Sequence, residues 1–403
     1  MRVAEPLKLK NSVELKNRFF KSAMSETMAN KRNQPNEKHI QLYRAWATGG
    51  AGVVVTGNVM VDRNALGEPG NVVIEDEQDI DILREWARYG TQNNTQLWMQ
   101  INHPGKQSPK SMSKEPVAPS AVPMANKYKG AFSPPRELTE GEIKNLVIRF
   151  VNTARIAKKA GFTGVQIHGA HGYLINQFLS PHDNRRKDAY GGSLENRMKF
   201  LIEIYEGMRE ILGHSYPIAL KLNSSDFNTM GFTEDESLQV VEKMASIGLN
   251  LIEISGGNYE KPKMSTGTDS EIFFIDYAQK LKERMDIPVV VTGGFRSFES
   301  MEIALEQNHT DMIGIARPLA LEPHLPNQIL AGSNVGITTQ HLTTGFHALD
   351  VKIGPAVGNF YYAMQLKRIA QGKSVRRHNN AWWPLLHLVG THGSEAFKPR
   401  RKK

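Results

Sequence analysis

The sequence predicts an α/β protein, a (β/α)8 TIM barrel with a C-terminal extension. Three observations indicate this class. Short apolar runs rich in β-branched residues recur along the chain, segments of helical periodicity separate them, and glycines follow the later runs. Strict alternation of strands and helices implies a parallel sheet. An open, doubly wound sheet is the competing architecture.

The apolar runs number eight, which is the strand count of a closed barrel. They cover residues 18–23, 52–57, 96–101, 164–167, 217–222, 251–255, 288–292 and 312–316. Residues 143–160 and 197–212 have helical periodicity. Two pairs, Thr139 with Glu142 and Thr233 with Glu236, match the capping box that starts a helix.

The domain organisation follows from this spacing. We expect residues 1–331 to form the barrel and residues 332–403 to form an extension that packs on the barrel or on a neighbouring subunit. The proline-rich connection at about 102–137 is too long for a turn, so we expect an excursion or lid beside the site. The extension ends in a basic run at 398–403, which we interpret as a solvated tail.

Composition excludes several classes of protein. The chain has no cysteine, which excludes disulfides, thiolate-bound zinc, cysteine-ligated iron–sulfur clusters and a cysteine nucleophile. No run of about 18 apolar residues occurs and no signal peptide is recognisable, so we expect a cytoplasmic protein without an integral membrane segment. The net charge of +9 favours anionic small ligands over nucleic acid, because no basic face is evident.

Polar side chains follow the fourth predicted strand. His168, His171 and Tyr173 lie just beyond its end, and active sites of such barrels lie at the C-terminal ends of the strands. We therefore expect a catalytic site here. Two histidines can also bind zinc, as in a metal hydrolase, but the nearest carboxylate in the sequence, Asp183, is well beyond them.

Glycines follow the later strands. The dinucleotide fingerprint GxGxxG is absent after the first strand. Glycine pairs occur instead at 256–257 and 293–294, and Gly314 is followed closely by Arg317. The loops after strands seven and eight commonly bind phosphate in such barrels, which favours a phosphate site over plain tight turns.

Residues 168–197 carry a family resemblance. They read HGAHGYLINQFLSPHDNRRKDAYGGSLENR, which resembles the old yellow enzyme family of flavin-dependent ene-reductases and NADH:flavin oxidoreductases. Residues 16–18 leading to 22–24, Gln100, and residues 103–105 extend the resemblance, which covers about residues 3–330. Larger relatives with an iron–sulfur cluster are excluded by the absence of cysteine and by length.

The resemblance implies a ping-pong cycle with non-covalent FMN at the barrel mouth. NADH or NADPH reduces the flavin, and an electron-poor alkene, the expected small-molecule partner, then takes the hydride at its β-carbon. His168 and His171 match the donors to the substrate oxygen, and Tyr173 matches the proton donor. Homo-oligomerisation is compatible with the family. The open alternatives are another FMN barrel, such as a dihydroorotate-type dehydrogenase, and a non-catalytic flavin-binding protein.

The same resemblance implies the binding residues. Those expected to contact FMN are Ser22, Ala23, Met24, Gly57, Gln100, Lys221, Gly293, Gly294, Ala316 and Arg317. Those expected to contact substrate are His168, His171, Ser25 and Thr27. Gln100 matches a partner of the flavin pyrimidine edge and Lys221 a positive charge near N1 and O2, although Gln100 could be a satisfied core amide and Lys221 could pair with a carboxylate.

This chain departs from the family pattern in places. Ser25 stands where relatives often have Cys or Thr, Thr27 where some have Tyr, and Ala23 where proline is common. The substrate preference of relatives therefore cannot be transferred to this chain.

Overall fold

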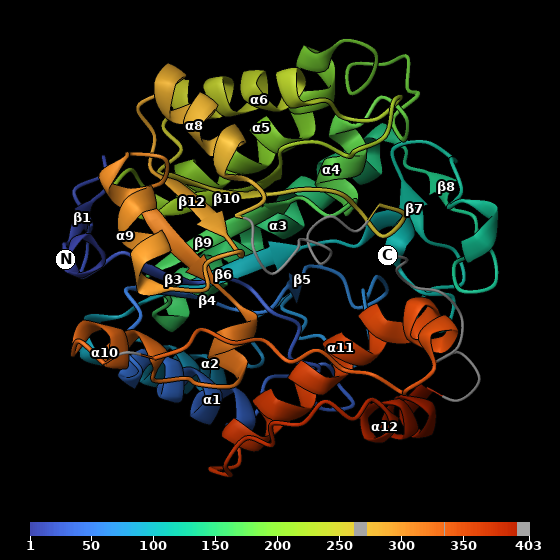
Figure 1. The fold of residues 1–403 in the computed structure, drawn as a ribbon. Helices are drawn as coiled ribbons and strands as arrows, with labels where there is room; N and C mark the ends of the chain where they lie inside the picture. Colours follow the sequence, from blue (N-terminus) through green and yellow to red (C-terminus); the bar gives the residue numbers. More distant parts are fainter. Residues whose placement is uncertain (262–271, 334, 393–403) are drawn as a thin grey trace.

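Eight parallel strands close into a barrel in the computed structural model, which describes residues 1–261, 272–333 and 335–392 (Figure 1). The strands are β3 (Phe19–Lys21), β4 (Val53–Val55), β6 (Gln96–Asn102), β9 (Gly164–Gly169), β10 (Ile218–Asn223), β11 (Leu251–Ser255), β12 (Val289–Thr292) and β13 (Met312–Ile315). Pairing of β13 with β3 and of β4 with β6 completes the ring. The predicted (β/α)8 class and its eight strands are confirmed, and the alternative prediction of an open, doubly wound sheet is wrong. The short strand β5 (Val59–Met60) pairs with the end of β6.

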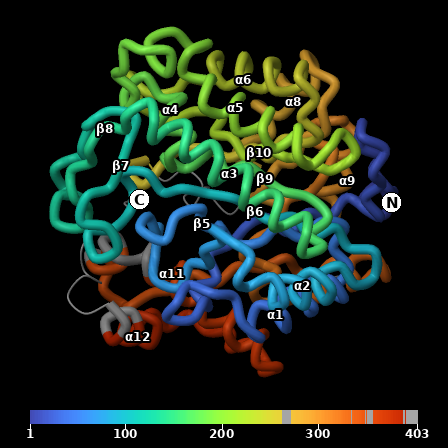
Figure 2. The backbone as a smooth tube through the Cα atoms, turned by 180° about the vertical axis from the view of Figure 1, so that it is seen from behind, coloured from blue at the N-terminus to red at the C-terminus, as the bar shows by residue number. Residues whose placement is uncertain are grey.

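Helices surround the barrel, as both ribbon and tube views show (Figures 1 and 2). They are α1 (Glu37–Thr48), α2 (Ile80–Gly90), α3 (Glu140–Ala160), α5 (Leu194–Leu212), α6 (Glu234–Ser246), α8 (Ile275–Arg284), α9 (Phe298–Glu306) and α10 (Leu325–Leu330). Both predicted capping boxes are present, with Thr139 and Thr233 as N-caps. The helix α3 ends at Gly161, whose φ of 98° is the left-handed conformation that glycine adopts without strain.

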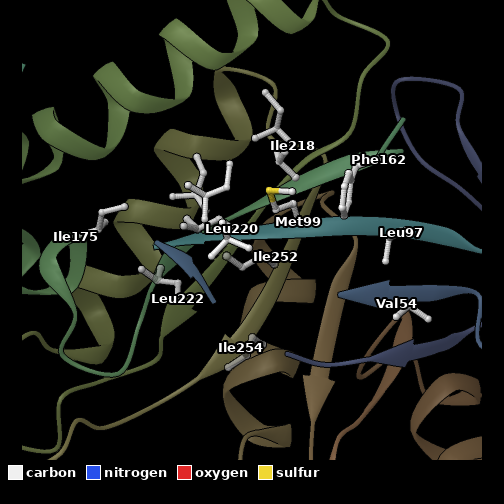
Figure 3. Close-up of a cluster of buried hydrophobic side chains, with 14 of the residues drawn as sticks. Val54, Leu97, Met99, Phe162, Ile175, Ile218, Leu220, Leu222, Ile252 and Ile254 are labelled. Carbon is white, nitrogen blue, oxygen red and sulfur yellow. The ribbon is translucent and has the colours of Figure 1, made fainter. Parts of the chain in front are cut away.

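Two hydrophobic clusters follow from the alternation of side chains along each strand. Outward-facing residues such as Val54, Leu97 and Leu220 form the large core beneath the helices (Figure 3). Inward-facing residues such as Phe20 and Trp98 form a smaller cluster inside the barrel. The hairpin of β1 (Leu7–Lys8) and β2 (Glu14–Leu15) adds Leu9 and Leu15 to this inner cluster. The floor of the barrel is therefore apolar, and the polar inward residues lie toward the C-terminal ends of the strands.

The predicted excursion leaves the barrel between β6 and α3. It contains η3 (Gly105–Gln107), β7 (Val117–Ala118), η4 (Asn126–Tyr128) and β8 (Arg136–Glu137), and β7 and β8 pair with each other at one side of the molecule (Figure 1). Tyr128 and Phe132 of this segment pack in one buried cluster with Tyr173 and Tyr259. The excursion thus contacts the region in which the catalytic residues were expected.

The chain after the barrel forms α11 (His347–Ile369) and α12 (Trp382–His392). Tyr361 and Leu366 of α11 belong to the large core, and α11 runs beside α1 in both views (Figures 1 and 2). The boundary at residue 331 stays a prediction, and the basic run at 398–403 lies outside the described residues. Within the described part of the chain, no helix has the length and apolar character that crossing a bilayer requires.

Candidate active site

The side chains of His168, His171 and Tyr173 converge at the C-terminal end of β9. The ring centroid of His168 lies 5.0 Å from that of His171 and 4.9 Å from that of Tyr173, with the rings nearly perpendicular in both pairs. A tight turn produces this arrangement, because His171 and Gly172 both have positive φ, 63° and 74°. The φ of His171 is unusual for a residue with a side chain, and the backbone N–H of His171 is held by Asn223 Oδ1 at 3.1 Å.

His168 is positioned as a neutral hydrogen-bond donor. It is 3% exposed. Burial, with a further contribution from the positive charge of Lys221, holds its pKa well below the usual value of a histidine, so the ring is neutral at pH 7. Its Nδ1 accepts the N–H of Ala170 at 3.3 Å. The single ring proton therefore lies on Nε2, which is the atom able to donate to a ligand.

The second histidine is oriented by a neighbouring strand. His171 Nε2 lies 2.6 Å from Ser255 Oγ, at the end of β11. If the serine hydroxyl donates to Nε2, the proton of a neutral His171 ring lies on Nδ1. In that case Ser255 sets which nitrogen of His171 can donate. Asn223 and Ser255 were not among the residues predicted from sequence, although Asn223 directly follows one predicted strand and Ser255 ends another on the catalytic side.

The hydroxyl of Tyr173 has a tyrosine partner. Its oxygen lies 3.0 Å from that of Tyr259, and both side chains are buried. Tyr259 is held in turn by Gln107, whose Oε1 accepts the Tyr259 N–H at 3.2 Å, and by Tyr128, whose hydroxyl donates to the Tyr259 carbonyl at 2.9 Å. Tyr259 was missed from sequence. Its position in the loop after the sixth strand, where barrel sites are built, was the available signal.

The upper lumen of the barrel holds a chain of polar side chains. Gln100 Nε2 donates to Gln166 Oε1 at 2.7 Å, and Gln166 Nε2 donates to Glu253 Oε2 at 2.8 Å. Lys221 Nζ donates to Glu253 Oε1 at 2.8 Å. Both alternatives left open by the sequence are therefore observed, because Gln100 has a core amide partner and Lys221 has a carboxylate partner. Gln100 and Lys221 nevertheless remain near the mouth of the barrel. Their strands, β6 and β10, both pair with β9, which carries His168.

The loops at the ends of β3 and β4 form another wall. Ser22 N donates to Ile315 O at 3.0 Å, which ties this loop to β13. The N–H of Gly57 is bound by Glu26 Oε1 at 3.0 Å and by the hydroxyl of Tyr43 at 2.9 Å. A side chain at Gly57 would meet the carbonyl oxygen of Met24, because its Cβ would lie 2.7 Å from that atom. The predicted contacts at residues 22–24 and Gly57 are thus adjacent.

The loop after β3 also carries Ser25 and Thr27, the two other predicted substrate contacts. Ala23 and Met24 are half-buried and Ser25 is exposed. Thr27 has a φ of 52°, and its Oγ1 is buried without a hydrogen-bond partner among the described residues. Within that part of the chain, no hydrogen bond joins Ser25 or Thr27 to the histidine pair or to Tyr173, so a substrate role for either residue stays a prediction.

The late glycines leave room for a ligand. Gly293 and Gly294 have φ of 89° and 87°, and no described atom lies within 4 Å of where a Cβ of Gly293 would be. Gly314 is the reverse case, since its Cβ would lie 2.2 Å from Thr292 Oγ1. Ala316 precedes η5 (Arg317–Ala320), and the Arg317 side chain is exposed. These residues suit a phosphate group approached by backbone N–H groups and one guanidinium.

Among the described residues, the side chains near this arrangement offer no metal site. Within residues 1–261, 272–333 and 335–392, no group of three or more histidine, aspartate and glutamate side chains could hold a metal ion. The metal-hydrolase alternative therefore has no ligand set in the part of the chain that is described. The donors instead comprise a histidine pair, an amide, a lysine and a glycine-rich anion cradle.

Comparison with known proteins gives a family and close architectural matches. A sequence model of the NADH:flavin oxidoreductase / NADH oxidase family matches residues 3–335. The NADH-dependent flavin oxidoreductase iliE of Hypocrea jecorina (strain QM6a) is 37% identical over 362 residues, which span 82% of this chain and 89% of that protein.

Two solved structures resemble the fold. The 2-naphthoyl-CoA reductase complex with 2-naphthoyl-CoA matches with a TM-score of 0.79 and 25% identity, over 92% of this chain and 57% of that one. The old yellow enzyme homologue from Zymomonas mobilis matches with a TM-score of 0.71 and 23% identity, over 83% of this chain and 94% of that one. These likenesses agree with the barrel fold.

Proposed function

Because the chain belongs to the NADH:flavin oxidoreductase / NADH oxidase family, we propose that it reduces the activated C=C bond of α,β-unsaturated carbonyl and related compounds. It is an oxidoreductase of the old yellow enzyme type, with FMN as cofactor and NADH or NADPH as reductant. The observation that carries the finer proposal is the convergence of two donor histidines and one tyrosine at the barrel mouth.

The residues at the mouth fit FMN. The open space and positive φ at Gly293 suit the close approach of a phosphate, and Arg317 adds a cation there. Gln100 and Lys221 offer an amide and an ammonium group at the far side of the lumen, which suits the pyrimidine edge of a flavin. Bound FMN would supply the hydride chemistry, taking a hydride from NAD(P)H and giving it to the β-carbon of the alkene.

The histidine pair would bind and polarise the substrate. Negative charge builds on the carbonyl oxygen of the substrate as hydride arrives at the β-carbon, so donors already aimed at that oxygen stabilise the transition state. His168 is buried and neutral with its proton on Nε2, and Ser255 orients His171. A neutral donor such as His168 suits a carbonyl or nitro oxygen better than a carboxylate, which a cationic site would favour.

Tyr173 would deliver the second hydrogen. After hydride addition the α-carbon needs a proton from a weak acid, and Tyr173 lies beside His168 with its hydroxyl inside the buried aromatic cluster. The hydrogen bond to Tyr259 fixes the direction of that hydroxyl. Tyr128 and Phe132 from the excursion cover the same cluster, which excludes water from the proton donor.

Two half-reactions test the proposal. Protein loaded with FMN is mixed anaerobically with NADH or NADPH in a stopped-flow instrument, and loss of the visible flavin band is followed. The reduced protein is then mixed with a panel of enones, enals, unsaturated esters and nitroalkenes, and return of the band is followed. Rapid reoxidation with formation of the saturated product is expected. A flavin that NAD(P)H reduces but that no electron-poor alkene reoxidises would show a different acceptor.

A further inference from the structure

A buried carboxylate, Glu253, lies at the centre of the polar lumen. It is on β11, directly opposite Lys221 of β10 in the sheet register. Inward-facing positions alternate along β11, from Leu251 in the apolar floor through Glu253 to Ser255 beside His171. Glu253 is 0% exposed. A carboxylate at such a position requires compensating donors, because an unpaired buried charge is strongly unfavourable.

Three donors satisfy this carboxylate. Its Oε1 accepts from Lys221 Nζ and from Thr292 Oγ1, each at 2.8 Å, and its Oε2 accepts from Gln166 Nε2 at 2.8 Å. One of the three is a cation, so Glu253 and Lys221 form a buried ion pair. The donors come from three different strands, β9, β10 and β12. The carboxylate on β11 therefore links the strands on one side of the barrel mouth to one another.

The network reaches two groups that the family resemblance assigns to the flavin. Gln166 Oε1 in turn accepts a hydrogen bond from Gln100 Nε2 at 2.7 Å. Ser22 Oγ lies 2.8 Å from Thr292 Oγ1, and because Thr292 gives its own proton to Glu253, Ser22 is the donor of that pair. The orientations of Gln100, Lys221 and Ser22 therefore depend on one acceptor. Losing it would leave Lys221 with one hydrogen-bond partner fewer but with its full positive charge.

The charge balance has a consequence for the cofactor. A lone lysine ammonium beside the pyrimidine edge would favour the negatively charged, reduced form of a flavin over the neutral oxidised form. A carboxylate 2.8 Å from the same ammonium offsets much of that field, since two opposite charges in contact act at a distance as a dipole. The net charge of the Lys221–Glu253 pair is then zero.

We propose that Glu253 is a positioning residue that sets the reduction potential of the bound flavin, by orienting Lys221 and offsetting its charge. The inference rests on the FMN site of the proposed function. It assigns to this chain a paired cation at the site of the pyrimidine edge in place of an unpaired one, and hence bound FMN would have a lower potential and be more strongly reducing. Nothing in the reaction requires Glu253 to touch substrate or flavin.

The test compares FMN-loaded variants by the midpoint potential of the flavin, measured against a reference dye during slow reduction. Glu253→Gln keeps the shape and removes the charge. We expect the midpoint potential of its flavin to rise by at least about 30 mV. For a two-electron couple, that rise corresponds to about a tenfold change in the ratio of affinities for reduced and oxidised flavin. Sulfite, which adds a negative charge to the flavin, should bind more tightly to the same extent. Glu253→Asp keeps the charge and should stay near the wild-type potential.

Asp311→Asn is the matched control. Asp311 precedes β13 at the opposite end of the barrel, where its Oδ2 accepts from Lys282 Nζ at 2.7 Å and from the N–H of Val289 at 2.8 Å. This variant also removes a carboxylate from a lysine pair, but it should leave the flavin potential unchanged. An unchanged or lowered potential in Glu253→Gln would overturn the assignment.

A double variant covers the case in which Glu253→Gln does not fold or retain FMN. Lys221→Gln combined with Glu253→Gln removes both charges and should have a potential close to that of the wild type. A much lower potential in the double variant would mean that Lys221 acts unopposed in the wild type, which contradicts the inference. If the wild-type protein itself binds no FMN, the proposed function fails, whereas FMN-bound variants of equal potential refute only the role of Glu253.

Discussion

The hydroxyl oxygens of Tyr173 and Tyr259 lie 3.0 Å apart inside a buried aromatic cluster. Tyr173 belongs to the turn after β9, whereas Tyr259 belongs to the loop after β11, so the contact joins two separate loops at the mouth of the barrel. Tyr128, from the excursion, holds the backbone of Tyr259 through a bond to its carbonyl. The proposed proton donor, Tyr173, is thus oriented by two segments that lie far from it in the sequence, the loop after β11 and the excursion.

Removing the two hydroxyls separately should distinguish donor from positioning residue. Tyr173→Phe should slow alkene reduction by about a hundredfold or more and leave reduction of the flavin by NAD(P)H unchanged, because only the second half-reaction needs the proton. Tyr259→Phe should slow the same half-reaction by about fivefold, the effect of one hydrogen bond of about 1 kcal/mol. Stopped-flow traces of each half-reaction give both values.

Tyr190→Phe is the control for these two changes. Its hydroxyl is also buried in part, but it bonds to Glu203 at 2.9 Å on the outer side of the barrel. It should leave both half-reactions at wild-type rates. Equal slowing of both half-reactions in Tyr173→Phe would argue against a proton-donor role.

Replacing the histidines should abolish recognition of the substrate oxygen. A phenolate bound at the same donors gives a long-wavelength charge-transfer band with an oxidised flavin, so His168→Ala combined with His171→Ala should remove phenol binding and the band. Each single change should lower the rate of alkene reduction by about a hundredfold to a thousandfold, since one oxyanion donor contributes about 3 to 4 kcal/mol. His214→Ala, on the exposed surface, is the control. Unchanged phenol affinity in the double variant would contradict the assignment.

The serine partner of His171 gives a gentler test of the same idea. Ser255→Ala removes the group at 2.6 Å from His171 Nε2, so the ring is free to take either tautomer. We expect phenol affinity to fall by about threefold to tenfold, the effect of one hydrogen bond, with the charge-transfer band still present at saturation. Ser255→Thr keeps the hydroxyl and should restore most of the affinity. Failure of threonine to rescue binding would indicate a packing role for Ser255.

The fold was predictable from sequence because a barrel repeats one pattern eight times. Each strand run appeared where expected, with ends shifted by one or two residues, as for the run at 18–23, observed as Phe19–Lys21. Glu253 was missed for a physical reason. In the run Leu251–Ser255 it reads as the one charged residue of a mostly apolar strand, and its partners on neighbouring strands, Lys221 among them, are set by the sheet register. Tyr259 and Gln107 were missed because they lie in loops without periodicity, and their contacts exist only in three dimensions.

Acid should destabilise the protein through its buried histidines. Burial lowers the pKa of His103 to about 4, and it lowers that of His168 as well. In the unfolded chain both titrate near 6.5. The unfolded state therefore binds more protons between those values, and stability is present above about pH 6.5 and falls as pH drops toward 4. For His103 alone the loss from pH 7 to pH 5 is about 2 kcal/mol.

A single variant isolates that contribution. His103→Gln cannot gain a proton on unfolding, so its unfolding free energy should fall less between pH 7 and pH 5 than that of the wild type, by about 2 kcal/mol. Urea unfolding of FMN-loaded protein at the two pH values measures the difference. His214→Ala, which replaces an exposed histidine, should keep the wild-type dependence. Parallel pH profiles for His103→Gln and the wild type would show that folding does not lower the pKa of His103.

The close approach of β12 and β13 at the predicted phosphate loops gives a final test. A Cβ at Gly314 would lie 2.2 Å from Thr292 Oγ1 and 2.8 Å from the backbone oxygen of Val291, so Gly314→Ala must push the two strands apart. Overpacking of this kind costs about 1 to 3 kcal/mol. Because Thr292 also bonds to Glu253, the shift would disturb the lumen network. We expect a lower midpoint of thermal unfolding together with weaker FMN binding, measured by fluorescence quenching of added FMN.

Gly141→Ala is the control, since nothing lies within 4 Å of its Cβ and its place in the first turn of α3 tolerates alanine. Normal FMN affinity in Gly314→Ala would mean that the phosphate loops tolerate separation of β12 from β13.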